Sequence, residues 1–429
     1  MKKVIGMLAL LAFVGNVASA ELLKNFKADG KIEVNAYQVN NAADYNKDAA
    51  DKKNDVDTRV QINAGFDLNE DANAVVSVVK NDRQYGSASQ DANTITTKLF
   101  FEQAYINLKG VLGFDHKLGR QYYGNEGDLM VFYGPTAWPY QSVRNVALQS
   151  MPVSALDGYT GWYKTGKWDI HGVLANAANA NVAADNDQDL FGLVAKYDLG
   201  KEYVNPSAYY YRYTTQAGTG FAGPNDHLDV VGVKSNGKYM GFDYNAEFAM
   251  NMGQNNDAVN TTGLAAAGTN KYQGYGFMAN VKYGLDLAGK LDLMAEYAMG
   301  SGDKKATDDK VKAFYSINSD YRPGVIYGGF YTNAGITNLT TYNVGAMWMP
   351  SSIEKLSIGA KYYNFAETEK LGGKSNIGTE MDLCVNWKHS ENVNVKAYAA
   401  SFTPEKDTVP AVTTDDAATM LGAAFSVKF

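Results

Sequence analysis

Charged side chains recur at alternate positions along several short stretches of the chain. Asp243 and Glu247 lie in one stretch, Asp292 and Glu296 lie in another, and the alternate residues of each are apolar. A β-strand turns successive side chains to opposite faces, so this spacing places the carboxylates on one face and apolar groups on the other. Rows of charge on the polar face of a strand can attract ions and orient polar solutes, as in selective pores.

Basic side chains gather in the same way on strands near the two ends of the chain. One hypothesis is therefore a lumen with an acidic wall and a basic wall, and the alternative is that the charges pair into ladders. The sequence leaves both open. Residues expected on the polar face are Arg59, Arg212, Asp243, Glu247, Asp292, Glu296, Glu380, Asp382, Lys388 and Lys396.

Enzyme chemistry finds little support in the sequence. The four histidines are separated along the chain and no nucleophile motif accompanies them, although pairs assembled by folding stay open. Cys384 is the single cysteine, and no His or Cys cluster has metal-ligand spacing. We therefore predict no catalytic site, no cofactor and no metal.

The charged stretches are predicted to be strands, joined alternately by short turns and by long connections. Composition agrees, with 30 tyrosines, 42 glycines and only 9 prolines. Short turns are expected at residues 69–71, 109–110, 165–166, 200–202, 236–238, 286–289, 350–352 and 389–391. Longer polar connections are expected near 40–55, 83–94, 121–153, 177–186, 215–225, 253–270, 300–337, 366–373 and 403–415. This alternation predicts an all-β transmembrane antiparallel β-barrel of about 18 strands, with short periplasmic turns and long extracellular loops.

The amino terminus predicts export. Lys2 and Lys3 precede a short apolar run that ends at Ala18-Ser19-Ala20, the three parts of a secretory signal peptide. We divide the chain into a signal peptide, 1–20, and an outer-membrane barrel domain, 21–429. Loss of Lys2 and Lys3 takes the net charge from −7 to −9, which argues against nucleic acid as a partner.

The last residues predict how the barrel closes. Leu421, Phe425 and Phe429 share one face of a strand that runs to the carboxyl terminus. We expect this strand to pair with a first strand near residues 32–37. A soluble sandwich, propeller or β-helix is the alternative, but no fixed-period repeat supports the last two.

Several ordered motifs resemble a known family. They are Phe101-Glu102-Gln103-Ala104-Tyr105-Ile106, Lys117-Leu118-Gly119-Arg120-Gln121-Tyr122-Tyr123-Gly124, Leu156-Asp157-Gly158-Tyr159, Ala298-Met299-Gly300-Ser301-Gly302-Asp303, Ile377-Gly378-Thr379-Glu380-Met381-Asp382-Leu383 and Ala400-Ser401-Phe402-Thr403-Pro404. In this order they resemble the alginate-export-type porins, which are 18-stranded outer-membrane barrels. The resemblance implies passage of an anionic polysaccharide or of smaller solutes, with Arg120, Asp157, Glu380 and Asp382 as pore-lining candidates. The family's exporter has a basic constriction, whereas this chain carries mixed charges.

Two long connections are candidates for function. The 121–153 connection contains Arg144, which we include among the pore-lining candidates, and the apolar run Met130-Val131-Phe132-Tyr133. That run is expected either to fold inward as a constriction or to belong to a strand. The 300–337 connection carries Asp303, Asp308 and Asp309; a Ca²⁺ site and a solvated loop are both considered, and the spacing is not that of an EF-hand.

These observations together predict an outer-membrane porin: a water-filled channel for passive diffusion of hydrophilic solutes. The alternatives are an exporter of an anionic polysaccharide and a plugged structural or adhesive barrel. Expected partners are outer-membrane lipid, small solutes or oligosaccharides, and the barrel-assembly machinery, which Phe429 would address because it resembles the terminal aromatic of such barrels. Monomer and homo-oligomer both remain open.

Overall fold

A computed structural model describes residues 24–42, 45–48, 51–80, 99–135, 155–178, 187–215, 226–255, 270–305, 308–331, 335–370, 375–406 and 416–429. The expected signal peptide and Arg144 lie outside these ranges. Within them, no helix has the length and apolar character needed to cross a membrane.

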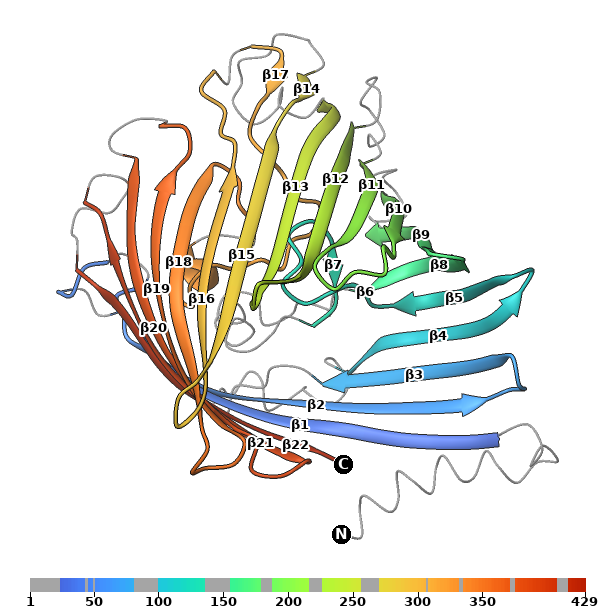
Figure 1. Ribbon diagram of the computed structural model, residues 1–429, viewed down its shortest axis with the longest axis horizontal. Coiled ribbons are helices and arrows are strands. Elements are labelled where there is room, and N and C mark those ends of the chain that lie inside the picture. The colour runs from blue at the N-terminus through green and yellow to red at the C-terminus, as the bar shows by residue number, and fades with distance from the viewer. Residues whose placement is uncertain are drawn as a thin grey trace.

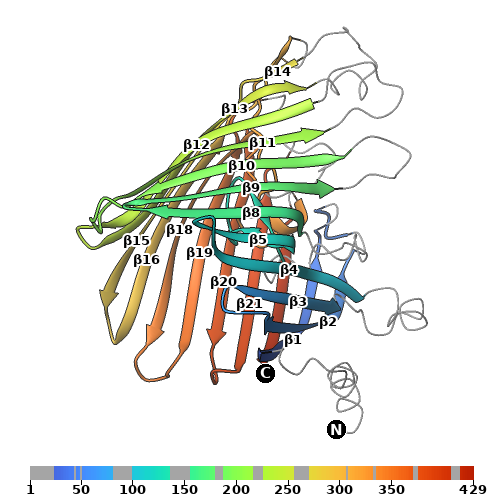
Figure 2. The same cartoon turned by 90° about the vertical axis from the view of Figure 1, so that its right-hand side faces the viewer.

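The described part of the chain forms one closed antiparallel barrel of 18 strands, each paired with the next in sequence and the last with the first (Figures 1 and 2). The wall strands are β1 (Lys24–Asn40), β2 (Lys53–Asp67), β3 (Ala72–Lys80), β4 (Leu99–Val111), β5 (Phe114–Gln121), β8 (Leu156–Thr165), β9 (Trp168–Ala178), β10 (Gln188–Tyr197), β11 (Asn205–Thr215), β12 (Asp226–Tyr239), β13 (Phe242–Asn255), β15 (Tyr275–Asp286), β16 (Gly289–Gly300), β18 (Leu339–Pro350), β19 (Leu356–Glu367), β20 (Asn376–Trp387), β21 (Val393–Pro404) and β22 (Ala418–Lys428). The predicted fold class and strand number are confirmed.

Short turns and long connections alternate around the wall as expected, with two local corrections. Residues 236–238 were expected to form a turn, but they continue β12 and pair with β13, and the chain turns at Met240–Gly241 instead. The backbone N–H of Lys238 donates to the Glu202 carbonyl at 2.8 Å, so the neighbouring turn also supports this extension. Similarly, β4 continues past residues 109–110 and turns at Leu112–Gly113.

The seam between the first and last strands confirms the expected closure. Ile32 pairs with Val427 and Tyr37 pairs with Gly422. At the short-turn end, Gly30 and Phe429 exchange backbone hydrogen bonds of 2.8 and 3.0 Å. Pairing therefore continues to the last residue and joins the two strand edges along residues 30–40 of β1.

The outer face of the wall carries the apolar side of each strand. Leu174, Val233, Leu383 and Leu421 are aliphatic side chains that are more than half exposed there. Aromatic side chains concentrate near the short turns, where Phe114 packs on Tyr163 and Phe242 on Tyr283; the exposed ones include Trp168, Tyr203, Tyr239, Trp348, Trp387 and Phe429. An apolar band with an aromatic rim is the surface expected where hydrocarbon surrounds a barrel.

Two connections leave the long-loop end and turn into the barrel. The first inner segment, residues 122–135, contains the short strands β6 (Tyr123–Gly124) and β7 (Phe132–Tyr133), which Figure 1 shows inside the ring of wall strands. The second inner segment, residues 308–331, contains β17 (Lys310–Val311) and one π-helical turn, η3 (Tyr327–Tyr331). β17 pairs with β14 (Asn270–Tyr272), which extends the wall beside β13.

Candidate functional site

The two inner segments are joined to each other inside the barrel. The backbone N–H of Phe132 donates to the Asn318 carbonyl at 2.8 Å, and the N–H of Ile317 donates to the Met130 carbonyl at 3.1 Å. Leu129, Met130 and Val131 are 0–3% exposed. The run from Met130 to Tyr133 thus satisfies both interpretations offered by the sequence, since it folds inward and also contributes a short strand.

Glu380 on β20 fixes the second inner segment to the wall. Its carboxylate accepts hydrogen bonds from the backbone N–H of Ile326 at 2.7 Å and of Tyr327 at 2.9 Å. Asp382, two residues along, accepts from the N–H of Val325 at 3.2 Å. Three buried backbone donors thus find their acceptors on two wall side chains, and Glu380 and Asp382 hold the turn before η3.

Gly324 allows this turn to approach the wall so closely. Its φ of +75° lies in the left-handed region that glycine adopts without steric cost. A Cβ at this position would lie 2.5 Å from Oε2 of Glu380, so any other residue would push the carboxylate away from its backbone donors. The backbone conformation and the approach of the carboxylate therefore both favour glycine here.

Further contacts attach the same segment along the lumen. The Tyr327 ring stacks on Phe365 with centroids 4.0 Å apart. On β13, the Asn251 side chain exchanges hydrogen bonds of 2.7 and 3.0 Å with the backbone of Tyr315. On β16, Glu296 accepts a hydrogen bond of 2.7 Å from the Tyr321 hydroxyl. The segment therefore spans the interior from β13 to β20.

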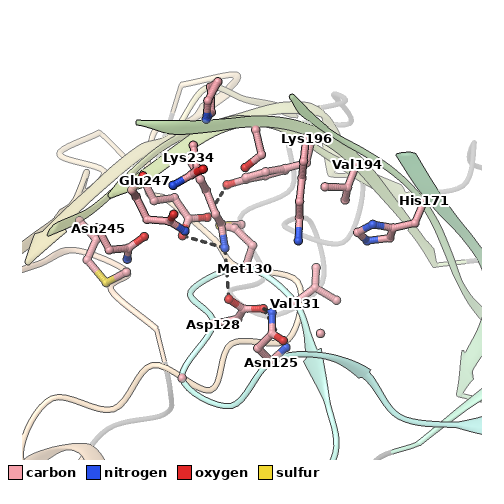
Figure 3. A pocket seen from close by; sticks show the side chains of 18 of the residues that line it. Asn125, Asp128, Met130, Val131, His171, Val194, Lys196, Lys234, Asn245 and Glu247 are labelled. Carbon is pink, nitrogen blue, oxygen red and sulfur yellow. Dashed lines mark hydrogen bonds and ion pairs between the residues drawn. The ribbon is translucent and has the colours of Figure 1, made fainter. Parts of the chain in front are cut away.

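Lys234 of β12 attaches the first inner segment. Its ammonium lies 3.2 Å from Asp128 on the segment and 3.1 Å from Glu247 on β13 (Figure 3). Glu247, which is 2% exposed, also accepts a 2.6 Å hydrogen bond from the Tyr209 hydroxyl. One lysine thus links a wall carboxylate to a carboxylate of the segment.

A polar cavity of about 620 Å³ lies in the lumen between this segment and the short turns. Lys196 of β10 and His171 of β9 enter it from one side, and Lys234, Glu247 and Asp128 meet on another (Figure 3). Its size falls within the range of small-molecule sites.

An uncharged tyrosine lies at the edge of this cavity. Tyr123 of the first inner segment shares a 3.1 Å hydrogen bond with Tyr211 of β11, although the direction of donation is not fixed. Burial raises the pKa of the Tyr123 phenol to about 12, so the hydroxyl stays protonated at neutral pH and adds no negative charge.

The predicted basic side of the lumen is present near the short turns. Lys388 and Lys396 line a second cavity of about 290 Å³, together with Lys31 and Lys428. Arg59, deeper on β2, donates to Glu102 at 2.7 Å and lies 3.7 Å from Glu33. Arg59 is therefore compensated by two carboxylates. The four lysines of the second cavity, in contrast, outnumber the carboxylates that line it.

The acidic side is paired rather than free. Asp243 lies 3.3 Å from Lys282, and Asp292 lies 3.3 Å from Lys290. Glu247 and Glu296 have the partners described above. Basic and hydroxyl groups on neighbouring strands and on the inner segments thus compensate this wall, which favours the ladder interpretation there.

Three residues expected in the lumen lie on the outward face instead. Tyr209 and Tyr211 of β11 point inward, so Arg212 between them points outward, where it pairs with Asp229 at 2.6 and 2.8 Å. Arg120 shares a face with exposed Leu118 and pairs with Asp157 of β8 at 2.7 Å.

These outward pairs lie toward the long-loop ends of their strands. A charge at that depth costs only about 0–1 kcal/mol, compared with ~2–4 kcal/mol for Arg or Lys at the bilayer midplane. The expected assignment of Arg120, Asp157 and Arg212 to the lumen is therefore corrected by their position in the wall.

The acidic connection after β16 uses its carboxylates locally. Asp303 accepts from the backbone N–H groups of Lys305 and Lys312, and Asp308 accepts from that of Lys310 at 3.0 Å. In the described ranges no cluster of three His, Cys, Asp or Glu side chains could hold a metal ion. These bonds are the ordinary ones of an acidic turn.

Lys234 and Asp128 were missed by sequence reasoning, whereas for Glu102 the sequence left open whether it faces the lumen. Lys234 follows residues 230–233, which are apolar on both faces, so the pattern does not reveal which face is inward. Exposed Val231 and Val233 show that Lys234 is on the opposite, inward face. For Asp128, the apolar residues that follow it were the sequence feature that indicated an inward-folded segment.

A closed 18-stranded barrel with an apolar outer band and a lumen narrowed by inward connections defines an outer-membrane β-barrel channel. The model of the alginate export family matches residues 26–411, and the chain belongs to this family. The protein is accordingly an outer-membrane protein of a Gram-negative bacterium. No curated protein sequence matches it.

Solved barrels have the same fold. OpdQ of Pseudomonas aeruginosa superposes with a TM-score of 0.59 at 10% identity, over 96% of this chain and 99% of that one. OccAB2 of Acinetobacter baumannii gives 0.59 at 11%, over 95% and 99%. The outer membrane protein OpdK of Pseudomonas aeruginosa gives 0.56 at 11%, over 94% and 99%. At these identities the likeness concerns the barrel fold.

Proposed function

We propose that the protein is a water-filled channel through which small hydrophilic solutes diffuse passively. The observation that carries this proposal is the docking of both inner segments across the lumen, held by Glu380, Asp382 and Lys234. Such a constriction limits the width available to a solute, while the polar cavity next to it offers hydrogen-bonding groups. Pore width and lining charge are the usual sources of selectivity.

The outer surface supports the partners that this function requires. The apolar band and its aromatic rim suit contact with lipid. Phe429 ends the last strand on the outer face, at 59% exposure, where assembly machinery could reach it before the seam closes.

Export of an anionic polysaccharide is the second candidate, and two observations favour it. One is family membership. The other is the group of four lysines at the second cavity, accompanied there by Glu33 and Glu391. Against it, most of the charges deeper in the lumen are paired and both signs occur there, so they offer no continuous basic track for a polymer.

Conductance separates these candidates. The purified, folded protein is inserted into a planar bilayer, and the reversal potential is measured across a KCl gradient. We expect open channels with weak ion selectivity. A clear cation preference would exclude the anionic-export candidate, and a strong anion preference would favour it over general diffusion. Folded barrels without conductance would refute the channel and leave the structural or adhesive alternative.

A further inference from the structure

One side of the 620 Å³ cavity presents an uncompensated ammonium group. Lys196 of β10 points into the cavity beside His171 (Figure 3). Its cross-strand neighbour Asp169 pairs instead with Lys164 at 3.2 Å. Among the described residues no carboxylate lies within ion-pair distance of Lys196, although Asp169 and Asp198 line the same cavity together with Lys167. The ammonium of Lys196 therefore has no ion pair of its own among these residues.

Another side of the cavity is negative. Lys234 lies between Asp128 and Glu247, so one positive charge faces two negative ones and the cluster carries a net charge of about −1 when both acids are ionised. Glu296, which also lines the cavity, is bonded by the neutral groups of Tyr321 and Asn343. No cation of the described residues lies within ion-pair distance of Glu296.

The space between these sides is lined by groups that can bind a polar solute. Asn125 comes from the first inner segment, and Asn245 and Asn280 come from β13 and β15. Side-chain amides both donate and accept hydrogen bonds, so they tolerate either end of a dipolar solute. The charged groups would orient a bound solute, and the amides would hydrogen-bond with its polar groups.

We infer that this cavity is a subsite for small zwitterionic solutes of the amino-acid type. The solute carboxylate faces Lys196, and the solute ammonium faces the cluster of Asp128, Lys234 and Glu247. This inference rests on the proposed diffusion function and names one class of solute that the channel favours.

Charge complementarity separates this class from its competitors. A simple anion satisfies Lys196 but also meets the acidic cluster, and a simple cation meets the opposite conflict. A neutral solute of the same size gains neither attraction. The zwitterion meets complementary charge at both of its ends, whereas each singly charged competitor meets one like charge. A site discriminates between similar solutes through such differences.

The test compares alanine with lactamide, a neutral isomer of the same mass, and with sodium lactate. Proteoliposomes containing the folded full-length protein are diluted into isosmotic solutions of each solute, and the swelling rates are recorded. KCl conductance of the same preparations is measured in parallel. We expect alanine to enter at least about threefold faster than lactamide, a factor equivalent to ~0.7 kcal/mol.

Two variants test the two sides of the cavity separately. Lys196→Gln and Asp128→Asn should each reduce the ratio of alanine to lactamide toward one. Lys282→Gln, which removes a paired lysine outside the cavity, serves as the matched control and should retain the ratio. Heat-modifiable gel mobility identifies folded barrels in every preparation.

The outcomes distinguish the inference from the function beneath it. Channels that conduct KCl but pass alanine and lactamide equally would overturn the zwitterion subsite and leave the diffusion channel standing. Faster entry of lactate than alanine would also overturn it, in favour of an anion site. Folded barrels without KCl conductance would refute the channel itself.

Discussion

The bond between Glu380 and the second inner segment offers the sharpest test of how the lumen is narrowed. In Glu380→Gln, the amide oxygen can still accept from one backbone N–H, but the amide nitrogen is a donor and faces the other. One of the two N–H groups, of Ile326 or Tyr327, then loses its acceptor in a site where residue 380 is 1% exposed.

The expected magnitude follows from that geometry. A buried donor left without an acceptor costs about 1–3 kcal/mol. With about 2 kcal/mol, and a factor of ten for each ~1.4 kcal/mol, the undocked segment becomes roughly thirtyfold more populated. The undocked segment no longer crosses the lumen from β13 to β20, so each undocking event should appear as a step to higher conductance.

The assay is single-channel recording of folded protein in a planar bilayer. Glu354→Gln is the matched control, because Glu354 lies exposed in the turn after β18 and undergoes the same substitution away from the docked segment. Glu380→Gln should show larger and more frequent upward steps than either wild type or control. Identical step amplitude and frequency in correctly folded Glu380→Gln channels would refute the view that this carboxylate holds the constriction.

Three further outcomes are expected. Lys234→Met leaves the Asp128–Glu247 pair uncompensated, so local cation occupancy should rise by about fivefold for ~1 kcal/mol of added attraction, and the reversal potential should shift toward cation preference; an unchanged potential would contradict this. Gly30→Val places a side chain where a Cβ would lie 2.4 Å from the Phe429 ring and 2.9 Å from a backbone oxygen, which should destabilise the seam by about 1–3 kcal/mol and lower the temperature at which heat-modifiable mobility is lost; an unaltered temperature would show that the seam relaxes freely. Arg212→Ala should leave ion selectivity unchanged because Arg212 points outward, and a shifted reversal potential would place it in the lumen after all.

The wall of the barrel was predictable because its physics is local. Alternation along residues 242–252 shows which side chains of β13 face water. Its even-numbered residues are apolar or aromatic, whereas its odd-numbered residues include Glu247. Turn residues mark the short connections to within a few positions. The terminal strand could be paired with the first because no other partner remained for either edge.

Facing could not be predicted where a strand offers similar residues on both sides. In β11, residues 209–211 are all tyrosine, so the sequence does not show whether Arg212 turns toward water or lipid. The structure decides through Tyr209 and Tyr211, whose hydroxyls meet Glu247 and Tyr123 inside. A period-2 pattern separates the two faces of a strand. It does not show which face is inward when both carry polar and apolar residues.

The inner segments were the least predictable part because their partners are distant in sequence. Residues 130–133 suggested inward folding, but nothing local indicates that Asn318 would complete their hydrogen bonds. Glu380 was expected to line the pore, whereas its carboxylate is occupied by backbone donors from residues 326 and 327. Such roles depend on contacts that form only when the barrel is closed.

The link between Phe132 and Asn318 spans 186 positions of the chain, and the carboxylate that secures the second segment lies later still, on β20. A nascent barrel consequently lacks its constriction until most of its strands are in place. A completed wall with undocked segments would be a wide leak in the cell's permeability barrier. Because Glu380 and Asp382 lie on β20, the second inner segment can be held by these acceptors only when most of the wall strands are present.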